Sequence, residues 1–297
     1  YTSDGISRTT NAVISQTDVS GTSTSSYLSD VIGGGVLYNM PISEISTLGL
    51  GYDVTYTDFT TTPFSPIIVT HHIADHGNTS FGLSLKSSFV KDTRNRTVFA
   101  ETGRLSSISA ELFLGIEGAS HTSLMYKTET NKGYVLKTFG FDWPTVLQAK
   151  TIIGLGFGLV SATSLPFYNK YFAGGSGTVR GFKGSSLGPL TYNAFRSENT
   201  CAAKAIPGKF IECDAVGGDF LSAAQFNWIF SPPAFLGEDT RSLRTTLFID
   251  VGNVFEKINN FEYNELRASY GIEFNILTPV GAVTVGFVDT LKTKEGD

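Results

Sequence analysis

The stretch that decides how this chain folds reads YFAGGSGTVRGF and covers residues 171–182. Its glycines allow positive φ angles and a close approach of the backbone to other parts of the molecule. A loop tip in bulk water has no need of Val179 and Phe182, the apolar neighbours of Arg180. Inside a cavity, the planar and permanently charged guanidinium of Arg180 can meet a buried carboxylate. The stretch therefore predicts a loop tip that folds inward and is held by its arginine.

The sequence around this stretch indicates a strand, a long polar loop and further strands. Residues 152–160 read as a strand, and residues 161–218 are predicted to form the long loop that contains the stretch. This loop holds both cysteines of the chain, Cys201 and Cys213. In an oxidising compartment they would form a disulfide; the alternatives are two free thiols or half of a metal site. No nearby His or Cys completes a zinc set, so the spacing favours the disulfide.

The composition restricts the chain to two classes of β protein. Hydrophobic residues make up 41% of the 297 residues and charged residues only 16%, whereas proteins usually carry about 25% charged residues. No run of about 18 apolar residues occurs, so a membrane-spanning helix is not expected. A soluble β protein and a membrane β-barrel remain. The net charge of −5 and the lack of a basic run argue against nucleic acid as a partner.

Alternation of apolar and polar residues predicts about eleven strands, because successive strand residues face opposite sides of a sheet. A soluble sandwich shows the same alternation. Aromatic residues near strand ends, and connections that alternate between short turns such as 141–148 and long polar loops such as 60–78, favour a membrane barrel. The expected fold class is therefore all-β, an antiparallel transmembrane barrel. The predicted strands are 5–17, 31–40, 48–57, 80–89, 107–116, 121–141, 150–159, 220–230, 243–251, 265–276 and 282–287.

The stretch at 171–182 resembles the signature loop of the Omp85 outer-membrane assembly family. Three further segments resemble the family in the expected order, namely DAVGGD at 214–219, FIDVGNVF at 248–255 and LTPVG at 277–281. The resemblance covers essentially the whole chain. It implies one transmembrane barrel domain over residues 1–297, in which the loop 161–218 is extracellular and folds into the lumen. It also implies an integral protein of the Gram-negative outer membrane.

The same resemblance implies a fragment of a larger assembly factor. Compared with the family's barrel of about sixteen strands, the chain is expected to begin near the fifth strand and to stop after the fifteenth. The N-terminal strands, the last strand and the POTRA domains are therefore expected to be absent. The implied function is folding and insertion of outer-membrane proteins through an offered strand edge and a locally weakened bilayer. The implied partners are membrane lipids, unfolded outer-membrane clients and accessory lipoproteins; no cofactor is expected.

Three other functions stay open at this point. A two-partner secretion transporter, or another Omp85 translocation pore, has the same signature and barrel but exports its client. A passive porin would lack the VRGF loop. An outer-membrane enzyme needs a convergent acid–base set, which the sequence does not offer, and Ser176 stands in GGSGT rather than in a nucleophile elbow. No enzyme activity and no catalytic residue are therefore expected.

The resemblance places the arginine of the loop inside the lumen, where it anchors the loop to the barrel wall. The anchor motif consists of Val179, Arg180, Gly181 and Phe182. By alternation Asp250 faces the polar side of its strand and is the expected main partner of Arg180. Family members carry a second acidic partner one strand earlier, where this chain has Asn227, and Glu273 one strand later is expected to compensate. The alternative is a solvated loop arginine, since exposed charges are the rule.

Two further motifs receive structural interpretations. The run HHIADH at 71–76 has metal-binding side chains, but it is predicted to lie in a solvated outer loop with no helix to fix its geometry. Gly154, Gly156 and Gly158 mimic a dinucleotide-binding loop, but they lie inside a predicted strand. There they are expected to make room in a crowded lumen or to ease bending of the sheet. No metal site is therefore expected.

Overall fold

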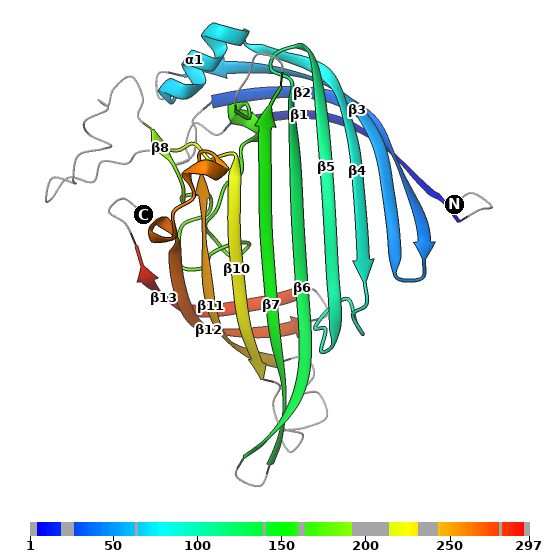
Figure 1. Ribbon diagram of the computed structural model, residues 1–297, viewed down its shortest axis with the longest axis vertical. Coiled ribbons are helices and arrows are strands. Elements are labelled where there is room, and N and C mark those ends of the chain that lie inside the picture. Colours follow the sequence, from blue (N-terminus) through cyan, green and yellow to red (C-terminus); the bar gives the residue numbers. More distant parts are fainter. Residues whose placement is uncertain are drawn as a thin grey trace, which may run out of the picture.

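One antiparallel sheet of eleven strands makes up the fold (Figure 1). The structure is a computed structural model that describes residues 5–18, 27–62, 65–138, 141–159, 164–191, 214–230, 243–278 and 281–293. The strand order is β1-β2-β3-β4-β5-β6-β7-β10-β11-β12-β13, and every neighbouring pair is antiparallel. The predicted all-β class with about eleven antiparallel strands is confirmed.

The strands are longest in the middle of the sheet, where β6 and β7 each have 18 residues. The first seven are β1 (Ser7–Asp18), β2 (Tyr27–Ser43), β3 (Ser46–Thr61), β4 (Thr79–Asp92), β5 (Gly103–Glu117), β6 (His121–Thr138) and β7 (Phe141–Gly158). The last four are β10 (Phe220–Phe230), β11 (Leu243–Phe255), β12 (Arg267–Thr278) and β13 (Gly281–Lys292). The short strands β8 (Leu190–Thr191) and β9 (Asp214–Ala215) form a separate pair.

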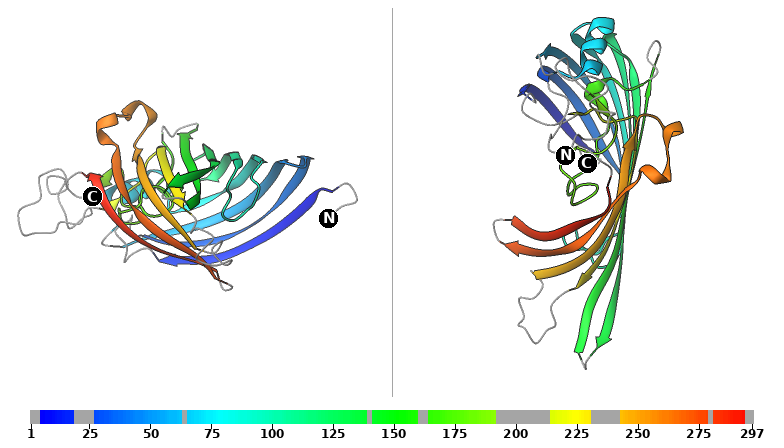
Figure 2. Two further views of the ribbon diagram at one scale, coloured as in Figure 1. Left: turned by 90° about the horizontal axis from the view of Figure 1, so that it is seen from below. Right: turned by 90° about the vertical axis from the view of Figure 1, so that its left-hand side faces the viewer.

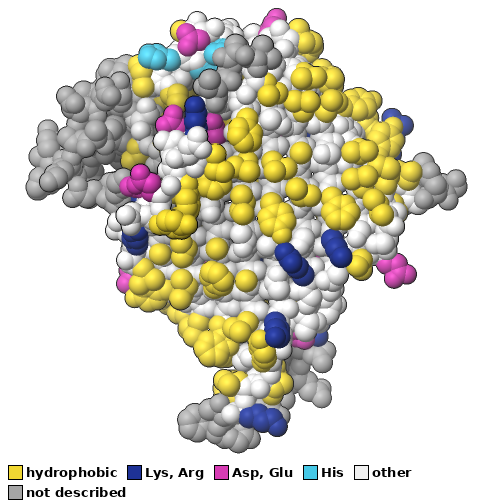
Figure 3. All heavy atoms as spheres, in the orientation of Figure 1, with side chains coloured by type: hydrophobic (Ala, Val, Ile, Leu, Met, Phe, Trp, Pro, Cys, Tyr) yellow, Lys and Arg dark blue, Asp and Glu magenta, His cyan; other side chains and the backbone are white. Residues whose placement is uncertain are grey.

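The sheet is strongly curved, so it has a convex outer face and a concave inner face (Figure 2). Large apolar side chains cover the outer face, where Figure 3 shows them as a broad band. Examples from separate strands are Tyr52, Leu85, Ile108, Phe226 and Ile249, which are 42–56% exposed. The inner face instead carries buried polar residues, among them Gln225, Arg244, Thr246, Asp250 and Ser269. This division follows from strand alternation and is the one expected for a membrane wall.

Two predicted connections differ from the structure. The segment 60–78 was expected to be a polar loop, but it contains the helix α1 (Ile67–His76), whose Val69 is fully buried. The segment 141–148 was expected to be a turn, but it is the first part of β7, which pairs with β6 as far as Thr138↔Phe141. Pro144 fits there because, among the described residues, β10 pairs with β7 only from Thr145 onward, so no described strand needs the missing amide hydrogen of Pro144 on that side.

The helix α1 forms a small aromatic core with the start of the long loop. Val69 packs there with Phe59 at the end of β3 and with Phe167 of the 3-10 helix η1 (Phe167–Asn169). His72 contacts the ring of Phe167 at 5.2 Å between centroids and stacks on His76 at 4.6 Å. Burial of this apolar surface stabilises the ten-residue helix, which is too short to be stable alone. No helix in the described part of the chain is long and apolar enough to cross a membrane.

Packing of α1 is expected to weaken in acid. Burial, followed by the charge of His76, lowers the pKa of His72 from 6.5 to about 4. The unfolded segment therefore takes up a proton at a higher pH than the packed one. The contribution of His72 is complete above pH 6.5, declines as the pH falls toward 4, and changes no further below that value. Hydrogen exchange of the α1 amides, corrected for intrinsic rates, measures this decline.

A pair of variants isolates His72 as the cause. His72→Phe keeps a ring against Phe167 but cannot titrate, so protection of α1 should become independent of pH between 4 and 6.5. His71→Asn changes the exposed neighbour and should leave the pH dependence of the wild type in place. An unchanged pH dependence in His72→Phe would contradict the assignment.

Candidate functional site

Residues 164–191 of the long loop lie against the inner face of the sheet (Figure 2). The stretch at 171–182 makes its reversal there with three glycines at positive φ, Gly174 at 107°, Gly175 at 85° and Gly181 at 88°. The Gly175 amide donates to the Phe182 carbonyl at 3.1 Å, which closes the turn. The Gly174 amide donates to Oγ1 of Thr178 at 2.8 Å. These bonds make the tip a defined turn that presents Arg180 toward the strands.

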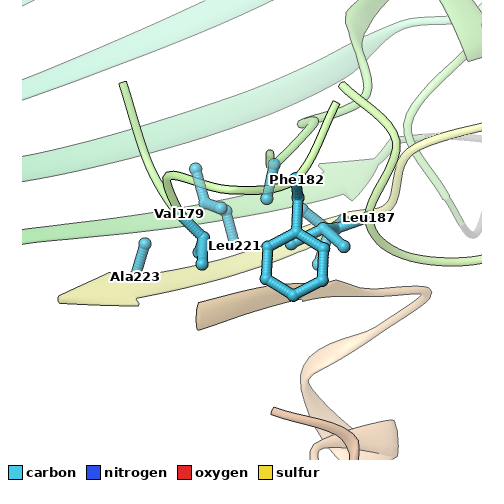
Figure 4. Packing of buried hydrophobic residues seen from close by; sticks show 7 residues of the cluster. Val179, Phe182, Leu187, Leu221 and Ala223 are labelled. Atoms are coloured by element: carbon cyan, nitrogen blue, oxygen red, sulfur yellow. The ribbon is translucent and has the colours of Figure 1, made fainter. Parts of the chain in front are cut away.

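Apolar side chains of the loop pack onto β10 and β11 (Figure 4). Val179 and Leu187 are fully buried there, and Phe182 is nearly so. The cluster consists of Ala173, Val179, Phe182 and Leu187 from the loop with Leu221, Ala223 and Val254 from the strands. Burying a side chain of the size of Val or Leu contributes about 1.5–3 kcal/mol. The two apolar residues that flank Arg180 are therefore part of the attachment.

Two glycines of β7 create the space in which the start of the loop lies. A Cβ atom on Gly154 would meet the ring of Tyr171 at 3.0 Å, and one on Gly156 would meet Cδ1 of Leu165 at 2.1 Å. The hydroxyl of Tyr171 donates across the strands to the carbonyls of Leu124 at 3.2 Å and Leu155 at 3.3 Å. The expectation that these glycines make room on the inner face agrees with this geometry.

Arg180 forms a bidentate ion pair with Asp250 of β11. Its Nε donates to Oδ2 at 2.7 Å and its Nη2 donates to Oδ1 at 2.6 Å. The backbone amide of Arg180 also donates to Oδ2 at 3.0 Å. The Asp250 side chain is fully buried and that of Arg180 is 9% exposed. Such charge-assisted, paired hydrogen bonds are stronger than neutral ones and fix the orientation of both groups.

Three other wall residues complete the surroundings of the guanidinium. Nη1 donates to Oε2 of Glu273 at 2.8 Å, and Nη2 donates to Oδ1 of Asn227 at 2.6 Å. The guanidinium carbon lies 3.6 Å from the centre of the Phe248 ring, a cation–π contact. The structure therefore brings together all four polar residues that the sequence analysis singled out. The two carboxylates give this site one more negative than positive charge.

A chain of amides extends from this site along the inner face, and sequence reasoning missed it. Nδ2 of Asn227 donates to Oε1 of Gln148, and Nε2 of Gln148 donates to Oε1 of Glu129 at 3.2 Å. Glu129 in turn forms ion pairs with Lys150 and Arg94. Gln148 was assigned to a turn, so its place in the strand was not considered. Extending the alternation of Lys150 back by two residues would have placed Gln148 on the inner face.

Gln225 of β10 holds the other side of the loop tip. Its Nε2 donates to the carbonyls of Ser176 at 3.2 Å and Thr178 at 3.1 Å. Gln225 lies two residues before Asn227 and so shares its face by alternation, but the sequence analysis did not single it out. Because Gln225 lies opposite Asp250 in the register of β10 and β11, the two side chains hold successive parts of the same turn. The loop tip is thus bonded to the wall through both backbone and side chain.

The other candidate residues form no reactive centre in the described part of the chain. Ser176 accepts a hydrogen bond from Gln225 through its backbone carbonyl. The described residues contain no group of three or more His, Cys, Asp or Glu placed to hold a metal ion. The segment 71–76 is helical, which corrects its assignment to a loop. Cys201 and Cys213, and with them the predicted disulfide, lie outside the described residues.

Comparison with known proteins gives consistent matches over the whole length. The family model of the Omp85 superfamily domain matches residues 2–297. Among curated proteins, the chain is 24% identical over 331 aligned positions to the outer membrane protein assembly factor BamA of Neisseria meningitidis serogroup B (strain ATCC BAA-335 / MC58). That alignment covers 100% of this chain but 38% of the relative. The chain therefore spans less than half the length of this curated relative.

A solved structure shows the same fold. The crystal structure of BamA from Haemophilus ducreyi lacking POTRA domains 1–3 superposes with a TM-score of 0.81 at 20% sequence identity. The superposition covers 99% of this chain and 57% of that chain. The eleven-stranded sheet described above therefore corresponds to a large part of a transmembrane barrel wall.

Proposed function

This chain belongs to the Omp85 superfamily, whose domain model matches residues 2–297, and from that premise we propose that it is part of an assembly factor that folds and inserts outer-membrane β-barrel proteins. It is an integral protein of the Gram-negative outer membrane, as its family and fold indicate. Its proposed role is structural and mechanical, without bond-making chemistry. Its clients would be unfolded outer-membrane proteins, and its proposed partners are accessory lipoproteins and membrane lipids.

The observation that carries the proposal is the loop 171–182 anchored on the inner face. One guanidinium of this loop makes hydrogen bonds to residues of three neighbouring wall strands. An anchored loop braces the wall, because it ties β10, β11 and β12 to one turn. Such a brace keeps that part of the barrel rigid while another part opens. The likeness to BamA supports the same role.

The proposed mechanism rests on the cost of unpaired backbone groups in lipid. Each unsatisfied N–H or C=O group costs several kcal/mol in the bilayer core, so a client strand gains free energy when it pairs with an offered edge. Within the described strands, β1 and β13 each pair on one side only. In the intact barrel we place the edge that receives the client at the seam where the barrel closes, away from the anchored loop. Locally weakened lipid at that seam would lower the barrier to insertion.

Complementation tests the proposed function. The natural-length gene that contains this chain is expressed in its own host while the resident copy is depleted. Folded outer-membrane porins, measured by their heat-modifiable migration in gels, should be retained with the active gene and lost without it. Normal porin assembly after depletion, together with loss of a single exported protein, would contradict the proposal and favour a two-partner secretion transporter. Steady conductance with normal porin assembly would favour a passive pore.

A further inference from the structure

Charged residues on the two faces of the sheet are paired differently. On the inner face, basic side chains form ion pairs with carboxylates, such as Lys86 with Asp53 at 2.6 Å and Arg180 with Asp250 at 2.6 Å. Every ion pair that the structure shows in the described part lies on the inner face, in the long loop or in the segments that connect strands. The outer face has basic residues too, and these have no carboxylate partner among the described residues.

Four such residues form what we call the outer basic strip. Its members are Arg8 on β1, Lys91 on β4, Arg104 on β5 and Lys132 on β6, and all four are exposed. Each shares its face with an exposed apolar residue on the same strand. These neighbours are Ile14 on β1, Phe89 on β4, Ile108 on β5 and Tyr134 on β6, with exposures of 37–86%. The strip therefore lies on the face that contacts lipid.

The four residues lie at about one height in the barrel. A ladder of paired residues runs from Arg8 through Tyr38, Leu50, Ser87 and Ala110 to Leu124. The other three members are displaced from this ladder toward the end of the sheet that carries the short connections. Lys91 lies four residues from Ser87, Arg104 lies six residues from Ala110, and Lys132 lies eight residues from Leu124. Barrel strands about 4.8 Å apart and tilted by about 45° shift by about 1.4 residues per strand. The steady shift therefore places the strip along a line parallel to the membrane plane.

Aromatic side chains hold three members of the strip in place. The guanidinium of Arg8 lies 5.9 Å from the centre of the Tyr38 ring, and the ammonium of Lys132 lies 5.4 Å from that of Tyr134. Nη2 of Arg104 donates to the hydroxyl of Tyr126 at 3.0 Å. Pairs of aromatic and basic residues of this kind are typical of the boundary between lipid tails and headgroups. Figure 3 shows basic side chains within the apolar surface of this face.

The opposite end of the same outer face is acidic. Asp30 on β2 lies directly opposite Asp58 on β3, and both share the face of exposed residues such as Ile32. This end of the sheet carries α1 and the long loop, whereas the strip lies near the short connections between β2 and β3, β4 and β5, and β6 and β7. The outer face thus has opposite charge at its two ends. A surface that contacts only water would have no reason to collect basic residues at one end and acidic residues at the other.

We propose that the outer basic strip binds the phosphate groups of anionic phospholipids in the membrane leaflet on the side of the short connections. The four cations lack protein counter-charges in the described structure and lie in a row at headgroup height, and three of them are held beside aromatic side chains. Phosphate oxygens accept hydrogen bonds from guanidinium and ammonium groups, and a negative leaflet surface attracts each such group by about 1 kcal/mol. The strip would then set the depth of β1–β6 in the bilayer. This inference does not depend on the proposed assembly function.

Native mass spectrometry of the natural-length protein tests the proposal. The protein is released from nanodiscs that contain phosphatidylglycerol and phosphatidylcholine in equal amounts, and retained lipids are counted. The wild type should retain phosphatidylglycerol in preference. Each of Lys91→Gln, Arg104→Gln and Lys132→Gln should lower that preference by up to about fivefold, and the triple variant, which keeps only Arg8 of the strip, should lower it well below that of any single variant. Heat-modifiable migration in gels confirms that each variant is folded.

The chain offers a matched control on the same hairpin. Lys137 is exposed on β6, five residues from Lys132 and on the opposite face, so Lys137→Gln should leave the lipid preference unchanged. Equal retention of phosphatidylglycerol by the wild type and the triple variant would overturn the proposal. Retention of lipopolysaccharide in place of phosphatidylglycerol, or of a bound protein that the triple variant releases, would overturn it in favour of another occupant.

Discussion

Replacing Arg180 with Ala is expected to detach the loop 171–182 from the inner face. The change removes the partner of the fully buried Asp250 and the contact with Phe248. Breaking a buried ion pair costs about 3–5 kcal/mol. We expect the lower end of that range, because Glu273 is 16% exposed and water can approach the site from that side. Hydrogen exchange of the loop amides should rise by at least about a hundredfold, since about 1.4 kcal/mol corresponds to a factor of ten.

Two further variants make this expectation specific. Asp250→Asn should produce a similar defect, and the double variant should be no worse than either single one, because both remove the same interaction. Strictly additive effects would show that the two residues act independently. Lys183→Ala removes a positive charge from an exposed side chain of the same loop and should change loop exchange little. Porin assembly should fall in the Arg180 and Asp250 variants and stay normal in the Lys183 variant.

Replacing Gly174 with Ala is expected to have the second largest effect. Gly174 has a φ of 107°, and a Cβ atom there would lie 2.3 Å from the Lys183 carbonyl oxygen. A non-glycine residue in such a conformation costs about 1–3 kcal/mol, and the overlap with a backbone atom adds to this cost. The turn would have to open, which would withdraw the Arg180 amide and side chain from Asp250. Loop exchange should therefore rise as it does in Arg180→Ala.

The same turn contains its own control. Gly177 has no atom within 4 Å of its would-be Cβ, and it does not adopt a positive φ. Gly177→Ala should therefore leave loop exchange within about threefold of the wild type, which corresponds to less than 1 kcal/mol. If Gly174→Ala and Gly177→Ala behaved alike, the turn would not depend on the backbone conformation described here.

The sequence predicted the sheet well because one physical rule governs every strand. Lipid on one side and a polar interior on the other impose strict alternation, so residues such as Ile249 and Asp250 reveal their faces without any tertiary information. The position of Asp250 one strand after Asn227 and one before Glu273 follows from the same rule. The contacts between Arg180 and these three residues could not be predicted from the sequence by alternation. Alternation shows which face of the sheet a residue occupies, but not where along the strands a distant loop packs.

The misassigned segments show where local rules fail. Trp143 and Pro144 suggest a turn, yet the pairing of β6 with β7 continues past them because the hairpin extends beyond its neighbours. Polar residues and histidines around 71–76 suggest a solvated loop, yet Val69 finds an apolar core formed by Phe59 and Phe167. In the first case the pairing within one hairpin overrides the local turn signal, and in the second a contact with Phe167, far along the chain, decides the local structure. The amide chain through Gln148 was missed because Gln148 belongs to the segment 141–148 that was assigned to the turn.

The distance between the loop tip and the far edge of the wall tests the central claim most directly. Nitroxide labels are placed at Gly184, which has open space at its Cβ position, and at Val285 of β13, which is 54% exposed. Double electron–electron resonance spectroscopy of the protein in nanodiscs should give one narrow distribution of the distance between the two labels in the wild type. It should give a broad one for Arg180→Ala. A distribution that is equally broad in both proteins would contradict the claim that Arg180 anchors this loop to the inner face.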